Sequence, residues 1–431
     1  MPELLSPAGS LKTLRYAFAY GADAVYAGLP RYSLRVRNNE FSTLASLKEG
    51  IDCAHALNKK FLLAVNVLPH NRKVDTFIDD LKPIVALKPD ALIMADAGLI
   101  MLARQHFSEI PIHVSVQANT VNYAAVRFWE NLGATRVILS RELSISEIAL
   151  IRERCPNIEL EVFVHGALCI AYSGRCLLSG YFNHRDGNQG TCTNACRWRY
   201  RVSEGVNTDD ALLPQPYLLE EMGRREHEYM EIDEDEHGTY ILNSRDLRAV
   251  QHIQQLTDIG IDCFKIEGRT KSHYYCARVT RVYRRAIDDA VCRRPFNPQL
   301  LTELNALANR GYTEGFFNRH AAEDTQNYAD GASSSFTERF VAEVEHYDET
   351  TGYSDLIVKN HFEVGDTLTL ITPDETRTRV LTALWNQDHQ PINVAPGSGH
   401  RVRAQIGKTD TMTLIAGVCG KNQGSGIRGQ V

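Results

Sequence analysis

The sequence predicts an α/β protein with a (β/α)8 TIM-like barrel and a small C-terminal antiparallel β-barrel domain. Short apolar runs alternate with amphipathic helical stretches over the first 290 residues, and eight of these runs are typical of strands. From residue 336 the pattern changes to short strands separated by turns. The predicted domains are residues 1–330, with an insertion at about 167–246, and residues 336–431.

The eight predicted strands are parallel, because helical stretches such as LKTLRYAFAYG and LASLKEGIDCAHALN separate them. They are Glu3–Pro7, Ala24–Gly28, Phe61–Val67, Ala91–Asp96, Ile112–Asn119, Arg136–Glu142, Leu160–Gly166 and Cys263–Arg269. A doubly wound open sheet would have similar strands, but no G-x-G-x-x-G motif follows the first of them. A closed barrel is therefore the favoured architecture.

Most of the predicted strands begin apolar and end in polar residues. The carboxyl ends of barrel strands gather on one face, where the loops form the active site. We therefore expect Glu142, His165 and Glu267 at this face as candidate catalytic acid–base groups. The alternative for each is a polar strand end that only satisfies the backbone of a loop.

Four of the ten cysteines lie in the insertion after the seventh strand, with the spacing C-x6-C-x15-C-x3-C. They are Cys169, Cys176, Cys192 and Cys196. The chain has no secretory leader pattern and no run long enough to span a membrane, so we expect a cytoplasmic protein without a membrane partner. Disulfides are disfavoured there, and close-set cysteines indicate metal or redox chemistry.

The loose spacing of the four cysteines favours an iron–sulfur cluster over a structural zinc site, which usually has two Cys-x2-Cys pairs. Zinc and the absence of a metal remain open alternatives. A different class of function would make Cys169 a nucleophile activated by His165, four residues before it. The acidic stretch LEEMGRREHEYMEIDEDEH, in the same insertion, is predicted to be a mobile, solvated loop.

The formal net charge of -6 gives no general attraction to nucleic acid, so any nucleic-acid binding requires a local basic patch. Basic and aromatic residues interleave in RYSLRVR and RWRYR, a pattern that can grip unpaired bases. The candidate substrate-binding residues are Arg35, Arg37, Arg197, Trp198 and Arg269. Solvated surface is the alternative, and arginine is also a natural clamp for a small dicarboxylate. The C-terminal strands carry no catalytic motif, so we expect a docking or substrate-presenting role for them.

The stretches EVFVHGALCIAYSGRCLLSG, ELLSPAGSLKTLRYAFAYGADAVYAG, RYSLRVRNNEF, SVQAN, GTCTNACRW and KIEGRTKS resemble the signature segments of the collagenase-like peptidase family of unclassified catalytic type. The resemblance covers almost the whole chain. Within that family the chain is similar to the tRNA 5-hydroxyuridine modification proteins.

This resemblance implies oxygen-independent, prephenate-dependent formation of 5-hydroxyuridine at the wobble position of tRNA. It implies that the four cysteines Cys169, Cys176, Cys192 and Cys196 bind a 4Fe-4S cluster, acting as an electron relay or a Lewis acid. The implied partners are the tRNA anticodon loop, prephenate as cosubstrate, and electron-transfer or iron–sulfur assembly proteins. Arg35, Arg37 and Arg269 would meet the prephenate carboxylates. Hydrolysis of peptide bonds, from the collagen-degrading members, is the alternative function.

Overall fold

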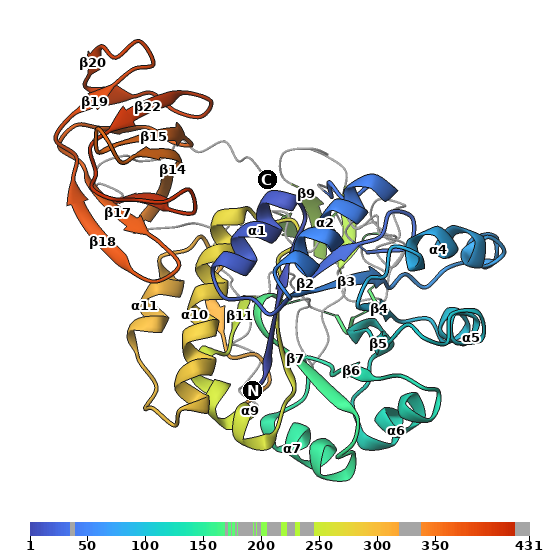
Figure 1. Ribbon diagram of the computed structural model, residues 1–431. Coiled ribbons are helices and arrows are strands. Elements are labelled where there is room, and N and C mark those ends of the chain that lie inside the picture. Colours follow the sequence, from blue (N-terminus) through green and yellow to red (C-terminus); the bar gives the residue numbers. More distant parts are fainter. Residues whose placement is uncertain are drawn as a thin grey trace.

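The computed structural model describes residues 1–34, 39–168, 171–173, 175–176, 179, 193, 195, 200–204, 217–221, 229–232, 245–318 and 338–418. Only the backbone is described within 200–204, 217–221 and 229–232. These residues form a barrel surrounded by helices and a second β domain beside α1 and α10 (Figure 1). In the described part of the chain, no helix is both long and apolar enough to cross a membrane.

Eight parallel strands form the barrel, and each is hydrogen-bonded to the next in chain order. They are β1 Glu3–Pro7, β2 Ala24–Gly28, β3 Lys60–Val65, β4 Ala91–Met94, β5 Ile112–Val114, β6 Arg136–Ile138, β7 Glu159–Ala167 and β12 Cys263–Ile266. The last strand closes the barrel, because Cys263 of β12 lies opposite Glu161 of β7 on one side and Glu3 of β1 on the other. This closure confirms the predicted TIM-like barrel and excludes the open sheet.

Helices cover the outside of the barrel, and most of them start after a side chain that caps the first turn (Figure 1). Ser10, Asn122 and Ser272 each accept a hydrogen bond from a backbone N–H of the helix that follows. The helices are α1 Leu11–Ala19, α2 Leu44–Ala56, α3 Asn71–Val74, α4 Phe77–Val85, α5 Ala97–His106, α6 Tyr123–Asn131, α7 Ile145–Arg154, α9 Ile253–Ile259, α10 His273–Val291 and α11 Gln299–Asn305. In the part of the chain that the structure describes, they are accompanied by two short 3-10 helices, η1 Val116–Ala118 and η4 Val250–His252.

Several strands are shorter than the sequence predicts, because their polar ends cap the next helix. Asp96 was expected inside a strand, yet its carboxylate accepts from Leu99 N and starts α5. Ser115 similarly accepts from Gln117 N and starts η1. At these two positions the polar residue at the strand end accepts a hydrogen bond from a nearby backbone N–H, which was the alternative to a role in the active site.

Two further strands extend the barrel sheet next to β7. Strand β11, Asp246–Arg248, runs antiparallel to β7 and places Arg248 opposite His165. Strand β13, Tyr312–Thr313, pairs with β11 in parallel. These strands bring the end of the insertion and a segment after α11 to the mouth of the barrel.

The insertion contains a three-stranded antiparallel sheet in its described part, formed by β8 Tyr200–Glu204, β9 Tyr217–Glu221 and β10 Tyr229–Ile232. Strands β9 and β10 pair with each other and lie within the acidic stretch or at its edge. The prediction of a solvated loop was therefore wrong for these residues. The pairing of these strands depends on tertiary structure, which the high charge of the stretch did not indicate.

The C-terminal domain is the predicted antiparallel β domain. Its main sheet has the order β18-β17-β23-β14-β15-β22-β19-β20. The strands are β14 Glu338–Asp348, β15 Tyr353–Val358, β16 Phe362–Glu363, β17 Thr367–Ile371, β18 Thr376–Val380, β19 Leu384–Trp385, β20 Pro391–Ile392, β21 Val394–Ala395, β22 Arg401–Ala404 and β23 Leu414–Val418. The outer strands β18 and β20 do not pair with each other within residues 338–418, so this sheet is open and is not the closed small barrel that the sequence predicted.

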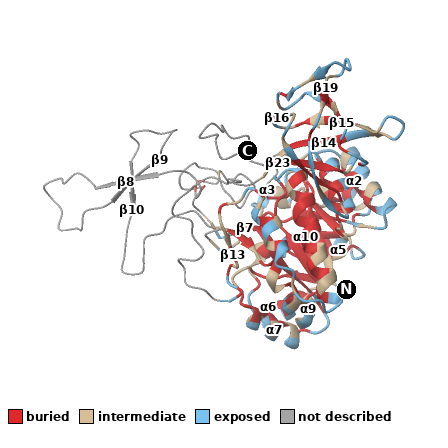
Figure 2. Ribbon diagram, turned by 90° about the vertical axis from the view of Figure 1, so that its left-hand side faces the viewer, coloured by how far each residue is buried: buried red, intermediate tan, exposed pale blue. Residues whose placement is uncertain are grey.

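The two domains share part of one hydrophobic core. Ile371, Leu414 and Ala416 of the C-terminal sheet belong to the same buried cluster as the barrel and its helices. A separate cluster, which includes Phe362 and Leu384, fills the rest of the C-terminal domain. Figure 2 shows the buried residues concentrated in the barrel and around α10. The C-terminal domain is therefore packed against the barrel by apolar contacts.

Candidate active site at the barrel mouth

His165 is buried at the carboxyl end of β7, with 1% of its surface exposed. Its ring lies among three tyrosines that come from α10 and β13. The distances between ring centroids are 6.0 Å to Tyr275, 5.5 Å to Tyr283 and 5.4 Å to Tyr312. The prediction that His165 lies at the carboxyl-terminal face is consistent with this position, and its catalytic role stays a proposal.

The hydrogen bonds of Tyr283 determine the tautomer of His165. The Tyr283 hydroxyl donates its single proton to Val164 O at 2.7 Å and accepts from Ala249 N at 3.2 Å. His165 Nδ1 lies 3.3 Å from the same hydroxyl oxygen, so the imidazole must be the donor in this contact. The proton therefore resides on Nδ1, and Nε2 is left with its lone pair.

Burial is the main influence on the basicity of His165. Desolvation lowers the pKa of the imidazole to about 3, helped by the positive charges of Arg248 and Lys271 and opposed by the carboxylate of Asp246. A group with this pKa is neutral at physiological pH. His165 can therefore accept a hydrogen bond or a metal through Nε2 without first losing a proton.

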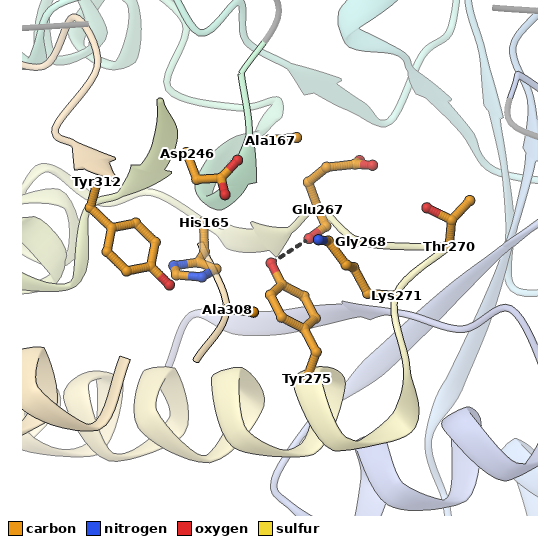
Figure 3. A pocket seen from close by; sticks show the side chains of 10 residues that line it. All are labelled: His165, Ala167, Asp246, Glu267, Gly268, Thr270, Lys271, Tyr275, Ala308 and Tyr312. Atoms are coloured by element: carbon orange, nitrogen blue, oxygen red, sulfur yellow. Dashed lines mark hydrogen bonds between the residues drawn. The ribbon is translucent and has the colours of Figure 1, made fainter. Parts of the chain in front are cut away.

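A small cavity of about 40 Å³ opens beside His165 (Figure 3). Its walls come from β7, β11, β13 and the turn that joins β12 to α10. The polar side chains lining it belong to His165, Asp246, Glu267, Thr270, Lys271, Tyr275 and Tyr312. A cavity of this size holds a small polar group.

Glu267 follows β12 directly and is 7% exposed. Its Oε2 accepts from the Tyr26 hydroxyl at 3.3 Å and lies 4.0 Å from Arg141 Nη2. Its backbone oxygen accepts from the Tyr275 hydroxyl at 3.0 Å (Figure 3). Arg141 also covers the Phe163 ring at 3.8 Å, so the carboxylate faces a cation held in place by an aromatic ring.

Asp246, at the start of β11, supplies the second buried carboxylate of the cavity. Its Oδ1 accepts from Arg310 Nε at 3.2 Å and from Arg310 Nη2. This pairing fixes the carboxylate at the cavity wall. Its contribution is a negative charge held near His165.

Arg269 and Glu142 differ from His165 and Glu267 in that neither lines the cavity. Arg269 is buried, and its guanidinium donates to Ser33 Oγ at 2.7 Å and to Leu34 O. It therefore holds the loop that follows β2, which in sequence leads into Arg35. Glu142 accepts a hydrogen bond from Ser140 in the loop between β6 and α7.

A buried ion-pair network fills the barrel beneath the cavity. Lys265 Nζ lies 2.7 Å from Glu161 Oε1, and Arg136 Nη1 lies 3.1 Å from Glu161 Oε2. Glu161 is 0% exposed. Lys265 Nζ also lies 4.5 Å from the centroid of the Tyr26 ring, whose hydroxyl contacts Glu267. This network is thus charged and almost completely removed from solvent.

Most of the other predicted site residues lie outside the described residues. These are Arg35, Arg37, Cys169, Cys192, Cys196, Arg197 and Trp198. Cys176 is described and is half-buried. Ser179, three residues after it, bonds through its hydroxyl to the Thr193 backbone N at 2.9 Å and to the Thr193 hydroxyl at 3.0 Å. Two segments that carry cysteines in the sequence are therefore joined here.

Sequence reasoning missed Asp246, Tyr275, Tyr283 and Tyr312 as site residues. A tyrosine on an amphipathic helix or at the end of a short strand is typical of a hydrophobic core, so the local pattern did not mark Tyr283 or Tyr312 as site residues. One signal was available for Tyr275: Ser272 is a helix-capping residue six residues after the strand, which places the first helical turn beside the strand end.

The arrangement combines a neutral imidazole, two carboxylates and three tyrosines at the mouth of a TIM-like barrel; Tyr283 is buried, and Tyr275 and Tyr312 are half-buried. The comparison with known proteins gives the class: residues 9–327 match the model of peptidase family U32, and residues 337–415 match that of the peptidase family U32 C-terminal domain. The chain belongs to peptidase family U32.

Among individual relatives, the chain is 56% identical over 422 residues to tRNA hydroxylation protein P of Escherichia coli (strain K12), covering 93% of each chain. It is 55% identical over 427 residues to tRNA hydroxylation protein P of Haemophilus influenzae, covering 93% of this chain and 92% of the relative. A collagenase of Porphyromonas gingivalis is 26% identical over 387 residues, which is 86% of each chain.

Proposed function

We propose that this chain is an enzyme that hydroxylates tRNA. The observation that carries the proposal is the 56% identity to a tRNA hydroxylation protein over 93% of both chains. In the finer form of the proposal, the product is 5-hydroxyuridine at the wobble position, formed without molecular oxygen and with prephenate as cosubstrate. An anticodon loop suits such a reaction, because its bases are unpaired and cost little to unstack.

The proposal gives Cys169, Cys176, Cys192 and Cys196 the role of ligands to a 4Fe-4S cluster. The hydrogen bonds between Ser179 and Thr193 support it, because four ligands from separate segments require those segments to meet. Four thiolates are also the donor set that such clusters use. When bound, the cluster would supply electron transfer or a Lewis-acid iron, chemistry that side chains lack.

The described residues supply binding and proton chemistry in this proposal. His165 Nε2 accepts a proton or hydrogen bond at the cavity, and Tyr283 holds the ring in that tautomer. Glu267 serves as the second acid–base candidate, and Glu142 as a third on the adjoining loop. Replacing the C5–H bond of uracil by C5–O removes two electrons from the base, and the cosubstrate would have to accept them, either directly or one at a time through the cluster.

Substrate contacts are assigned by charge. Arg35, Arg37, Arg197 and Trp198 are proposed to contact the anticodon loop and the prephenate carboxylates. Arg269 is proposed to act indirectly as well, because two of its nitrogens already bind Ser33 and Leu34 and hold the loop before Arg35.

The test is nucleoside analysis of unmodified tRNA incubated without oxygen, with and without prephenate. Wild-type protein should form 5-hydroxyuridine only with prephenate, and Cys192→Ser should form none. Cys292→Ser is the matched control, since Cys292 is an exposed cysteine at the far end of α10. No 5-hydroxyuridine from iron-loaded wild-type protein under any condition would refute the proposal.

Peptide-bond hydrolysis is the second candidate function, favoured by the likeness to a collagenase over 86% of the chain. It would require a single nucleophile, for which Cys169 beside His165 is the candidate. Hydrolysis of collagen peptides that persists in Cys192→Ser and disappears in Cys169→Ser would support this function instead of hydroxylation.

A further inference from the structure

The C-terminal domain contacts the first turn of α10, which also forms one wall of the cavity. Helix α10 starts at His273. His273 and Tyr274 contact the C-terminal domain, whereas Tyr275 lines the cavity beside His165. One helical turn therefore touches both the second domain and the candidate active site.

Glu343 of β14 is the centre of this contact, and its side chain is only 2% exposed. Its Oε2 lies 2.7 Å from His273 Nε2, and its Oε1 lies 2.5 Å from Lys12 Nζ and 2.9 Å from Lys359 Nζ. Burial alone would raise the pKa of Glu343, but the hydrogen bonds from His273, Lys12 and Lys359 outweigh it and hold the pKa well below its usual value. Glu343 is therefore a charged residue at the interface.

Aromatic packing supports the same turn. The Tyr274 ring stacks on Phe340 of β14 with centroids 4.4 Å apart. His273 lies between Phe340, at 5.6 Å, and Tyr16 of α1, at 5.0 Å. The rings of Phe340 and Tyr16 thus pack against the His273 imidazole, and Glu343 forms a hydrogen bond with its Nε2 atom.

The turn between β12 and α10 has little freedom to move by itself. Gly268 has φ +150°, and a Cβ added there would lie 2.6 Å from the Tyr275 ring. The turn is closed by the hydrogen bond from Lys271 N to Gly268 O, and Ser272 Oγ caps the helix by accepting from Tyr275 N. Tyr275 OH then donates to Glu267 O. A shift of the first turn therefore carries Tyr275 with it.

We propose that Glu343 is a positioning residue for the active site, which acts through His273 on Tyr275. By holding the first turn of α10, it keeps the Tyr275 ring beside His165 and its hydroxyl on Glu267 O. The C-terminal domain is thus a structural part of the active site. The test has two parts. The first measures activity and therefore rests on the proposed tRNA hydroxylation, whereas the second measures hydrogen–deuterium exchange and does not.

Other contacts keep the two domains together when Glu343 is altered. The Tyr20 hydroxyl lies 2.8 Å from the carbonyl oxygens of both Ile371 and Met412. Arg281, two turns further along α10, donates to Thr372 O at 2.8 Å. With the apolar core shared by the domains, these contacts make Glu343→Gln a local change.

The first arm measures steady-state hydroxylation by Glu343→Gln. A glutamine has one amide oxygen, which can serve either the two lysines or His273, so one side of the contact is lost. We expect kcat to fall about tenfold, with KM for tRNA within about twofold of wild type. Glu345→Gln is the matched control: Glu345 lies on the same strand, half-exposed and paired with Arg401, and its variant should keep wild-type kcat.

A double-mutant cycle separates positioning from general weakening. Because Glu343 acts through the Tyr275 ring and hydroxyl, Glu343→Gln should cause little further loss of kcat in a Tyr275→Ala background, which lacks both. The inference would be overturned if the losses of kcat in the two single variants multiplied in the double variant. It would also be overturned if Glu343→Gln had the same kcat as Glu345→Gln.

The second arm measures hydrogen–deuterium exchange of the backbone amides of residues 267–276, at a temperature where all variants are folded. Glu343→Gln should accelerate exchange there at least severalfold relative to Glu345→Gln, with exchange in β3 unchanged. Unchanged exchange in 267–276 would overturn the inference. If wild-type protein forms no 5-hydroxyuridine, the proposed function fails and this second arm alone decides the role of Glu343.

Discussion

The Nδ1 atom of His165 lies 3.3 Å from the Tyr283 hydroxyl, whose own proton is donated to Val164 O. This relationship places the imidazole proton on Nδ1 and leaves Nε2 as the acceptor in a buried site. Helix α10 thus contributes twice to the site, with Tyr283 fixing the His165 tautomer and Tyr275 forming the cavity wall.

Tyr283→Phe tests this arrangement. The change leaves His165 Nδ1–H without its acceptor, whereas Ala249 N still donates to Val164 O at 2.9 Å; an unsatisfied buried donor costs about 1–3 kcal/mol. We therefore expect the free energy of unfolding to fall by about 2 kcal/mol, measured by urea denaturation. The hydroxylation rate should also fall, because the imidazole can then adopt the other tautomer. Tyr353→Phe in the C-terminal domain is the control and should match wild type in both measurements.

The depressed pKa of His165 predicts a specific acid sensitivity. An unfolded histidine titrates near 6.5 and the folded one at about 3, so between these values the unfolded state binds more protons and stability falls as pH falls. Between pH 7 and pH 5, wild type should lose about 2 kcal/mol more than His165→Gln. Equal losses in the two proteins would show that His165 is not held neutral.

Glu161→Gln should be strongly destabilising. It leaves Lys265 buried without a counter-charge, and breaking a buried pair costs about 3–5 kcal/mol. Glu159→Gln is the matched control, because Glu159 also pairs with Arg136 but is half-exposed, and an exposed pair contributes at most about 1 kcal/mol. The comparison is made by urea denaturation, and equal effects would contradict the buried network.

The charge of Glu343 makes the free energy of unfolding depend on pH, which an uncharged residue at this interface would not do. Its folded pKa is lowered from 4.5, so its stabilising contribution is present above that pH and is lost as the pH falls below it. The difference in free energy of unfolding between wild type and Glu343→Gln should therefore be largest near neutral pH and shrink below about pH 4.5. A difference that stays constant down to pH 3 would contradict the charged contact.

The barrel could be predicted because its strands are apolar runs separated by helical stretches. The predicted limits of β1 and β2 agree with the structure, whereas the predicted ends of β4 and β5 were too long. The sequence does not distinguish a polar residue that ends a strand from one that caps the next helix. Asp96 and Ser115 were read as strand residues for this reason.

The position of a candidate site residue could be derived from the sequence where it follows from the residue's own strand, while the catalytic roles stay proposals. His165 and Glu267 line the cavity because each lies at the carboxyl end of a strand. Asp246 and Tyr312 reach the same cavity through strands β11 and β13, whose pairing depends on tertiary structure. The position of Asp246 and Tyr312 could therefore not be derived from the local pattern. The same holds for the contact between Glu343 and His273, because these two residues are 70 positions apart in the sequence.

The most direct test of the account relates cluster content to tRNA hydroxylation. Batches of the protein with different iron content per chain, prepared without oxygen, are given the same unmodified tRNA and prephenate, and 5-hydroxyuridine is measured by mass spectrometry. We expect product in proportion to iron, and none from a variant in which Cys169, Cys176, Cys192 and Cys196 are all serine. Undiminished hydroxylation by iron-free protein would contradict it.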